Sequence, residues 1–494
     1  MSQPEFEVAI VGCGFGGMGA AIQLRRMGVE SFVMVDREED LGGTWHVNRY
    51  PGLAVDIASL TYSYSFEPNP YWSHLYARGH ELKEYANHVA EKYDLRRHMR
   101  FGISVEKAHF NEEGNFWTLH PKGKAPITAR VLILATGFLS QPHTPDIEGI
   151  NTFKGKVIHT ADWDGNYPLE NKRAAVIGTG ATAVQLIPTI APELKQLDVY
   201  QRTPIWVTPK VDTSIPKVVQ NLFAKLPITQ KSARLISSGI LETIMVAGVL
   251  HNEKLPVLTR TMEKVCKAHM ARTIKDKTLR EKLTPNYSFG CKRPTFSNTY
   301  YPTFNRDNVE LVTDSIARIE EDAIVTVDGK RREIDTLILA TGFDLWEENF
   351  PAFEVVGRNQ RNLGEWWRSQ GFKAYQGVAI PGFPNLFSLA SPYAYNGLSF
   401  FSTIEGQMKH INRCLGEMIG RQAETFEVTE EANEAFVAQM KEKVQKSLFI
   451  HGQCGGSNSY YFNQHGEATL LRPTSTVSGM LAQQHFPIEA YQFS

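Results

Sequence analysis

Cysteine is scarce in this chain, and the cysteines lie far apart. There are five among 494 residues, none in a CxxC pair, at Cys13, Cys266, Cys291, Cys414 and Cys454. Because a zinc ribbon and a dithiol-disulfide reductase both need closely spaced thiols, this spacing argues against either. An odd number of scattered cysteines is instead typical of a protein from a reducing compartment.

The sequence also lacks an excess of charge of either sign. Its 52 Lys and Arg residues nearly balance its 53 Asp and Glu residues, giving a formal net charge of -1, and neither sign forms a long run. Nucleic acid and an anionic membrane are therefore not expected as the main partner. A small-molecule partner fits this composition better.

Long apolar segments are missing as well. The N-terminal "MSQPEFEVAIVG" places Pro4, Glu5 and Glu7 directly before a short apolar stretch, unlike a secretory signal. No run of about 20 apolar residues predicts a membrane-spanning helix. We therefore predict a cytoplasmic protein without stable membrane insertion, while the apolar stretch 239–250 leaves a contact with a membrane surface open.

The N-terminal segment carries a glycine-rich turn between a strand and a helix. An apolar run at 8–11 leads into Gly12, Gly14 and Gly17, which complete GxGxxG. Such a turn lets a pyrophosphate approach backbone N–H groups at a helix N-terminus. The next apolar stretch ends in Asp36, 24 residues after Gly12, where a carboxylate suits the ribose of an unphosphorylated adenosine. This half is predicted to bind FAD.

The same pattern recurs further along the chain. Gly178 and Gly180 follow a second apolar strand, and Ala183 takes the third position, where the fingerprint tolerates alanine. Arg202 lies 24 residues after Gly178, at the position that Asp36 takes in the first half. A guanidinium can grip a 2′-phosphate with two parallel hydrogen bonds, so this half is predicted to bind NADPH. A solvated loop arginine is the alternative for Arg202.

Both halves end alike, in an apolar strand followed by Ala-Thr-Gly-Phe at 135–138 and at 340–343. Between the second turn and this closure, apolar residues at helical spacing predict a helical insertion at about 205–286. The predicted fold class is α/β, with two Rossmann-like dinucleotide-binding domains, the second inserted in the first. The predicted domains are 1–150 with 342–494 for FAD, and 151–341 for NADPH.

Two longer motifs carry a family resemblance. Phe153, Gly155, His159, Trp163 and Asp164 match the FxGxxxHxxxW(P/D) pattern of the Baeyer-Villiger monooxygenases, which are class B flavoprotein monooxygenases. The stretch "GGTWHVNRYPGLAVD" matches a second, longer motif of the family. The matching residues are Gly43, Trp45, Tyr50, Pro51, Gly52 and Asp56. The chain resembles this family over most of its length. Relatives that oxygenate nitrogen or sulfur usually carry tyrosine where Trp163 stands.

The resemblance implies a reaction and a set of site residues. The family uses FAD, NADPH and molecular oxygen to convert ketones to esters or lactones, through a 4a-peroxyflavin and a tetrahedral Criegee intermediate. Arg293 is implied as the residue that stabilises negative charge on oxygen, and Asp56 as the carboxylate that positions it. The expected cofactor-binding residues are Gly12, Gly14, Gly17, Asp36, Thr44, Trp45, Asp56, Tyr62, Val105, Gly178, Thr179, Gly180, Ala181, Thr182, Ala183, Gln185, Arg202, Thr203 and Lys292.

The sequence leaves several alternatives open. The alternative function is a flavin monooxygenase of amines or sulfides, and sulfoxidation is expected as a side activity. His159, in the linker between the predicted domains, is expected to have a conformational role rather than to transfer protons or bind metal. Flexible lid segments are expected at 390–407 and 451–479, and Phe400 and Tyr460 fit a substrate pocket and a core equally. No motif specifies the ketone or the oligomeric state.

Overall fold

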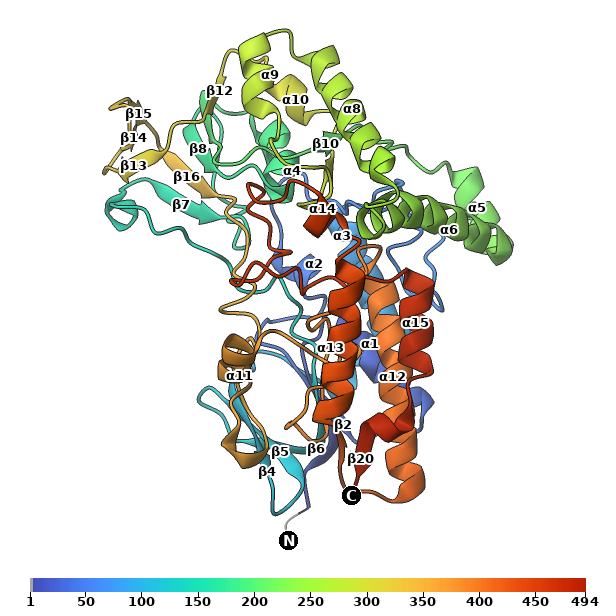
Figure 1. Cartoon of the computed structure of the whole chain (residues 1–494). Coiled ribbons are helices and arrows are strands. Elements are labelled where there is room, and N and C mark those ends of the chain that lie inside the picture. Colours follow the sequence, from blue (N-terminus) through green and yellow to red (C-terminus); the bar gives the residue numbers. More distant parts are fainter. Residues whose placement is uncertain (1–2) are drawn as a thin grey trace.

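The computed structural model of the chain describes residues 3–494, except the side chain of Met245. Its largest sheet lies in the lower part of the molecule (Figure 1), in the order β17-β4-β5-β6-β1-β2-β3, with β18 also paired to β6. The strands are β1 (Phe6–Val11), β2 (Phe32–Val35), β3 (Met99–Arg100), β4 (Val105–Asn111), β5 (Phe116–Pro121), β6 (Ile127–Leu134), β17 (Glu354–Val356) and β18 (Leu386–Ser388).

The centre of this sheet is parallel and buried on both faces. β1 pairs in parallel with β2 and β6, for example through Val8 with Phe32 on one side and Val131 on the other. Their continuous apolar sequences follow from this burial, because parallel strands are covered by helices on both faces. One such helix is α1 (Phe15–Arg26), which follows the first glycine turn and packs beside α12 (Phe400–Arg421).

The second sheet lies above the first in Figure 1 and is parallel throughout, in the order β12-β9-β8-β16-β7. Its strands are β7 (Lys156–His159), β8 (Arg173–Ile177), β9 (Gln196–Tyr200), β12 (Val309–Val312) and β16 (Thr336–Leu339). An antiparallel meander of β13 (Ile316–Ile319), β14 (Ala323–Thr326) and β15 (Arg331–Glu333) precedes β16. These strands fall between β6 and β17 in the chain, so the predicted α/β class with one unit inserted in the other is confirmed.

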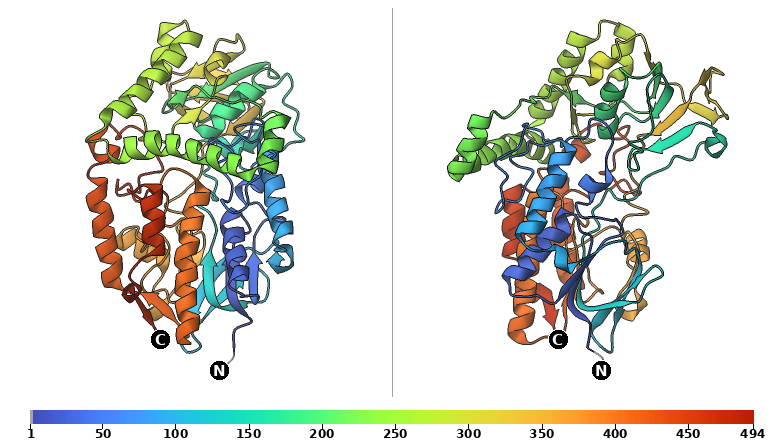
Figure 2. Two further views of the ribbon diagram at one scale, coloured as in Figure 1. Left: turned by 90° about the vertical axis from the view of Figure 1, so that its right-hand side faces the viewer. Right: turned by 180° about the vertical axis from the view of Figure 1, so that it is seen from behind.

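Helices occupy most of the chain between β10 (Val207–Thr208) and β11 (Thr295–Phe296), two strands that pair in parallel. They are α5 (Lys217–Lys225), α6 (Pro227–Leu241), η3 (Glu242–Ala247), α7 (Gly248–Leu250), α8 (Pro256–Thr273) and α9 (Lys277–Leu283). Figure 2 shows α5 and α6 extending to one side of the molecule.

One helical run in this region is more apolar than the sequence analysis indicated. Pro227–Leu250, formed by α6, η3 and α7, is long and apolar enough to cross a membrane by length and composition alone, with a mean hydropathy of 1.5. Only 24% of its apolar window is buried. The sequence did not reveal this run as a continuous apolar segment, because polar residues such as Gln230 and Arg234 interrupt it. A core helix of a soluble protein passes the same test, so the run by itself does not indicate a membrane span.

The remaining helices complete both halves. They are α2 (Thr44–Val47), α3 (Gly79–Lys92), α4 (Ala181–Ile190), α10 (Tyr300–Thr303), α11 (Leu363–Gln370), α13 (Glu430–Val444), α14 (Leu448–His451) and α15 (Thr476–Gln484), with short turns η1 (Arg96–His98), η2 (Ile150–Thr152), η4 (Arg358–Gln360) and η5 (Ile488–Ala490). A small antiparallel pair, β19 (Phe426–Val428) and β20 (Tyr491–Phe493), closes the C-terminus.

The segment 390–407 is not the surface lid that its glycine and asparagine residues suggested. Most of its residues are buried, and from Phe400 onward it forms the start of α12. Phe401 and Ile404 are fully buried in the core beneath α1. The helical spacing of these apolar side chains, rather than the preceding turn residues, determines where the segment packs.

Two of the scattered cysteines form a disulfide, which their sequence spacing did not indicate. Cys291 and Cys454 are 163 positions apart, with a Cα–Cα distance of 5.2 Å. Cys13, Cys266 and Cys414 are free and buried. The disulfide runs against the expectation of a reducing compartment, since disulfides persist mainly in oxidising surroundings. Sequence spacing did not indicate it, because it joins segments that only the fold brings together.

Candidate active site between the two glycine turns

Each glycine turn packs against the Ala-Thr-Gly element that closes its own half. Gly12 has φ +116°, and a Cβ atom there would lie 2.3 Å from the carbonyl oxygen of Ala135. Gly178 has φ +112°, and a Cβ atom there would lie 2.4 Å from the carbonyl oxygen of Ala340. Only glycine fits both the backbone conformation and the space. The repeated sequence elements are therefore two copies of one structural unit.

Both turns lead into helices whose first N–H groups have no side-chain cap. Gly14 precedes α1 and Gly180 precedes α4, and neither N-cap residue accepts a hydrogen bond through a side chain. Gly17 and Ala183 are buried within the first turns of these helices. Uncapped N–H groups and the helix dipole together suit an anionic pyrophosphate, so both turns fit a dinucleotide.

Asp36 lies at the end of β2, beside the first turn. Its buried carboxylate accepts hydrogen bonds from the backbone N–H groups of Cys13 (2.6 Å) and Glu38 (3.0 Å). Burial raises the pKa of Asp36, although these hydrogen bonds act in the opposite direction. Val105 begins β4 two residues after Ile103, whose N–H donates to the backbone oxygen of Asp36 at 2.8 Å. This backbone bond holds the segment that leads to Val105 beside Asp36.

A cationic group lies at the second turn. Arg202 and Lys292 are close enough that, after burial, the charge of Arg202 further lowers the pKa of Lys292, to about 8. Within residues 3–494, no carboxylate oxygen lies within 4 Å of either side chain. Thr179 donates to the backbone oxygen of Thr203 at 2.9 Å, which holds the loop of Arg202 against the turn. Two cations without a protein counter-ion fit a phosphate group.

The Asp56 carboxylate grips the Arg293 guanidinium from 237 positions away in the chain. Arg293 donates two hydrogen bonds, from Nε to Oδ2 at 2.8 Å and from Nη2 to Oδ1 at 2.7 Å. Burial favours neutral Asp56, but the charge and hydrogen bonds of Arg293 outweigh it and lower the pKa of Asp56. The carboxylate raises the pKa of Arg293 in turn, against the effect of burial. Both groups therefore stay charged.

Aromatic side chains surround this pair. The third donor of Arg293, Nη1, bonds to the hydroxyl oxygen of Tyr395 at 2.9 Å. Tyr62 accepts a hydrogen bond from Trp45 at 3.2 Å, and burial raises its pKa. Burial also raises the pKa of Tyr460 to about 12, despite the nearby charge of Arg293. The three tyrosines thus lie around the arginine, whose side chain is only 23% exposed, and its charge acts more strongly there than in water.

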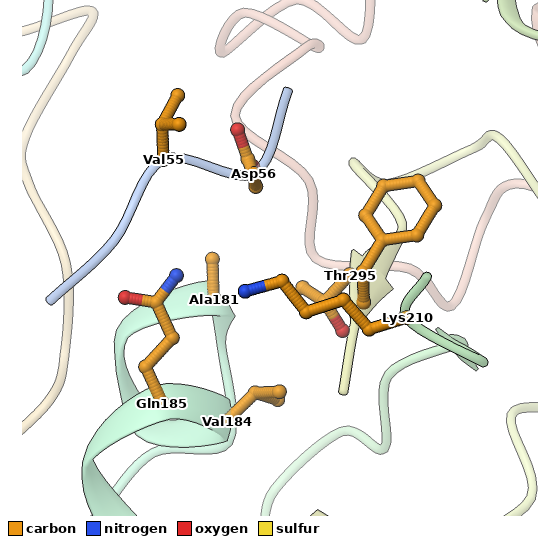
Figure 3. Close-up of a pocket in the computed structure, with 8 residues that line it drawn as sticks. Val55, Asp56, Ala181, Val184, Gln185, Lys210 and Thr295 are labelled. Atoms are coloured by element: carbon orange, nitrogen blue, oxygen red, sulfur yellow. The ribbon is translucent and has the colours of Figure 1, made fainter. Parts of the chain in front are cut away.

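A small pocket connects the ion pair with the second glycine turn. Figure 3 shows Asp56, the Lys210 ammonium and the N-terminal residue of α4, Ala181, around it. Lys210 is largely buried, 3.3 Å from Asp212 and 4.7 Å above the ring of Tyr76. Burial lowers its pKa, while Asp212 acts in the opposite direction. The pocket brings a second cation close to Asp56.

Gln185 lines this pocket and also makes contacts within the protein. Its Oε1 accepts from the Tyr50 hydroxyl (3.1 Å) and from the Ala54 N–H (3.2 Å), and its Nε2 donates to the Ala54 oxygen (2.9 Å). Thr44 is exposed at the start of α2. Through its bonds to Ala54, the predicted cofactor residue Gln185 connects α4 to the loop that carries Asp56.

Comparison with known proteins identifies the family. Residues 6–255 match the model of the pyridine nucleotide-disulphide oxidoreductases. A Baeyer-Villiger monooxygenase of Streptomyces coelicolor is 36% identical over 98% of this chain and 92% of its own. The solved structure of an oxidized steroid monooxygenase bound to NADP superposes with a TM-score of 0.88 at 28% identity, covering 99% of both chains. That of OTEMO in complex with FAD and NADP has a TM-score of 0.87 at 26% identity, covering 100% of both.

The chain belongs to the Baeyer-Villiger monooxygenase family. The resemblance inferred from the two longer motifs is thereby confirmed.

In this Baeyer-Villiger monooxygenase, the motif at 153–164 lies apart from Arg293. His159 ends β7; its Nδ1 accepts from the N–H of Ala161 at 3.1 Å, and its Nε2 lies 3.4 Å from the Thr341 hydroxyl in the second Ala-Thr-Gly element. Burial lowers the pKa of His159. Trp163 packs against the core of the second sheet, and Asp164 bonds to Lys156 at 2.8 Å on the surface. These contacts accord with the structural role expected for His159.

Two site residues of this monooxygenase were missed by the sequence analysis. Tyr395 lies in the segment 390–407, where glycine and asparagine suggested a lid, and Lys210 follows an apolar stretch without a recognisable motif. Of the two aromatics left undecided, Phe400 stands 6.0 Å from Phe138 between ring centroids, in the same aromatic group as Tyr395. Tyr460 is close enough to Arg293 for the two groups to influence each other's pKa.

Proposed function

We propose that this monooxygenase uses NADPH and molecular oxygen to convert ketones to esters or lactones. FAD binds at the first glycine turn and NADPH at the second. The observation that carries the proposal is the Arg293–Asp56 ion pair, enclosed by tyrosines and adjoining the pocket at the second turn. The cofactors named for the solved relative support the same assignment.

The two sheets suggest how the chain divides between the cofactors. Residues 1–150 and 342–494, which include the larger sheet, form the FAD-binding domain, and residues 151–341 form the NADPH-binding domain with its helical insertion at about 205–286. The carboxylate of Asp36 accepts from the ribose at the first turn, and Arg202 with Lys292 binds the 2′-phosphate at the second. The availability of NADPH supports a location in the cytoplasm, although a disulfide such as Cys291–Cys454 is unusual there.

When bound, the reduced flavin supplies the activated oxygen that attacks the ketone. Arg293 holds the negative charge that develops on oxygen during this attack. An arginine suits this task because its pKa lies far above neutrality, so it stabilises an anion without donating a proton to it. Asp56 fixes two of the guanidinium N–H groups, and Tyr395 accepts from a third. The arginine is therefore oriented before the substrate enters.

The proposal is tested by turnover with a panel of cyclic, linear and aromatic ketones, with NADPH consumption and product formation measured in the same sample. Esters or lactones that carry one atom from isotopically labelled oxygen are expected. Sulfides and amines form the second arm of the panel. Oxygenation of these compounds alone, with no ester from any ketone, would instead identify a flavin monooxygenase of soft nucleophiles.

A further inference from the structure

Helix α6 has its polarity reversed relative to an ordinary surface helix. Its residues Ile228, Leu235, Ile236 and Ile240 are 67%, 74%, 65% and 56% exposed. Their spacing of seven, one and four residues places them on a single helix face. A surface helix normally turns such a stripe toward the core. Here the apolar stripe faces outward.

The inward face of α6 is polar and well bonded. Gln230 is buried and donates to the backbone oxygen of Asn69 at 2.7 Å. The Arg234 guanidinium donates to the backbone oxygens of Leu60 (3.1 Å) and Ser63 (2.9 Å). Rotating the helix to bury its apolar stripe would break all of these bonds and leave buried polar groups unpaired. The orientation of α6 is therefore fixed by its own sequence.

Helix α5 extends the same surface. Val218 and Leu222 on α5 are 79% and 43% exposed, and Leu226, between the two helices, is 53% exposed. Both helices lie at the side of the molecule (Figure 2). We call this surface the α5–α6 apolar face; it comprises Val218, Leu222, Leu226, Ile228, Leu235, Ile236 and Ile240. Seven large aliphatic side chains exposed on two consecutive helices indicate a contact surface.

The charges on these two helices have one sign. Lys217, Lys225 and Lys231 are exposed, Arg234 is partly buried, and no Asp or Glu occurs between residues 213 and 241. The segment therefore carries four cations and no carboxylate, although the whole chain is close to neutral. Aliphatic side chains bordered by lysines match the boundary between lipid chains and anionic headgroups.

We propose that the α5–α6 apolar face docks this enzyme on the surface of a lipid bilayer that contains anionic headgroups. The aliphatic side chains enter the region between headgroups and acyl chains, and Lys217, Lys225 and Lys231 contact the phosphates. The helices lie on the bilayer rather than across it, because the inward hydrogen bonds of Gln230 and Arg234 keep α6 attached to the protein. A second copy of the chain is a poorer occupant, because a symmetric dimer through this face would set lysines against lysines.

The test uses the full-length, flavin-loaded protein and sedimentation with two kinds of vesicle. One is pure phosphatidylcholine, and the other contains equal parts of phosphatidylcholine and phosphatidylglycerol. The protein should sediment with the anionic vesicles, and high salt should weaken this binding. The double variant Leu235→Ser/Ile236→Ser should bind at least about tenfold more weakly. Lys225→Glu and Lys231→Glu should each lower binding about fivefold.

Matched controls separate docking from general stickiness. Ile419→Ser and Val477→Ser change side chains that are equally exposed, at 60% and 66%, on other helices, and should bind as the wild type does. Thermal melting confirms that each variant is folded. The proposal is overturned if the wild type does not sediment with anionic vesicles, or if the controls lose as much binding as the double variant. A wild-type dimer that the double variant dissociates, with no vesicle binding, would identify a self-association surface instead.

Discussion

Replacing Asp56 with asparagine tests the candidate site most directly, because the change removes a charge and leaves the shape almost intact. The carboxylate now accepts two hydrogen bonds from Arg293, at 2.8 and 2.7 Å. An amide offers only one acceptor, and its NH₂ group would face a guanidinium that only donates. A hydrogen bond to a charged group contributes about 1.5–3 kcal/mol, so the loss of one is enough to shift the arginine.

The expected cost follows from the role proposed for Arg293. Losing one preorganised donor to a developing oxyanion lowers kcat about 10²–10³-fold, or about 2.7–4 kcal/mol. We therefore expect Asp56→Asn to slow ester formation by about two orders of magnitude. The KM for NADPH should stay close to that of the wild type, because the cationic group at Arg202 and Lys292 is unchanged. More of the NADPH consumed should yield hydrogen peroxide instead of product.

The assay measures NADPH absorbance and ester by gas chromatography in the same reaction. Asp164→Asn is the matched control, because it makes the same chemical change in a surface ion pair, with Lys156 at 2.8 Å and side chains 40% and 37% exposed. Solvent screens such an exposed pair, so this variant should be indistinguishable from the wild type. Wild-type rates of ester formation and unchanged coupling in Asp56→Asn would refute the role assigned to the ion pair.

Three further predictions concern protons and thiols. Burial and the charge of Arg202 lower the pKa of Lys292 to about 8, so the side chain loses its charge above this pH. The KM of the wild type for NADPH should therefore rise from pH 7 to 9. In Lys292→Met, which has no charge to lose at this position, the rise should be much smaller. Burial lowers the pKa of His410 to about 3, so below pH 6.5 the unfolded chain binds a proton that the folded chain does not. Melting temperature should therefore drop as the pH falls below 6.5, with up to about 1.4 kcal/mol lost per pH unit, and His410→Gln should flatten the drop. In denaturant without reductant, a thiol reagent should titrate three cysteines, and all five after reduction; five before reduction would contradict the Cys291–Cys454 bond.

Local backbone geometry made the two dinucleotide units predictable. A turn in which only glycine fits, between an apolar strand and a helix, leaves a signature within about 30 residues. Gly12 and Gly178 carry that signature because each lies against an alanine of its own closing element. The same locality explains why the α/β class and the insertion of one unit in the other followed from the sequence alone.

The ion pair at the site was not predictable from local pattern. Asp56 and Arg293 came from the family resemblance, because no spacing rule connects positions 237 apart. Tyr395 and Lys210 lie in no motif, and the Cys291–Cys454 bond depends on two loops meeting in the folded chain. Each of these contacts depends on how the two sheets are placed, which periodicity does not encode.

The orientation of α6 could not be predicted for a related reason. Its apolar spacing indicates a helix, but the rule that apolar faces turn inward gives the wrong face here. The inward face is decided by acceptors on another segment, the backbone oxygens of Leu60, Ser63 and Asn69, which Arg234 and Gln230 reach. Specific hydrogen bonds therefore override the apolar pattern in this helix.

The two halves of the enzyme are joined at the site through hydrogen bonds. Gln185, on the helix that follows the second glycine turn, bonds to both the N–H and the oxygen of Ala54. Two residues further, Asp56 holds Arg293. A shift of α4 on binding at its N-terminus must therefore either carry the Asp56 loop with it or break both bonds to Ala54. The bonds between Gln185 and Ala54 require a specific geometry, and they can break because water can replace either partner. A movement of α4 is therefore transmitted to the loop that orients Arg293 as long as the bonds between Gln185 and Ala54 persist.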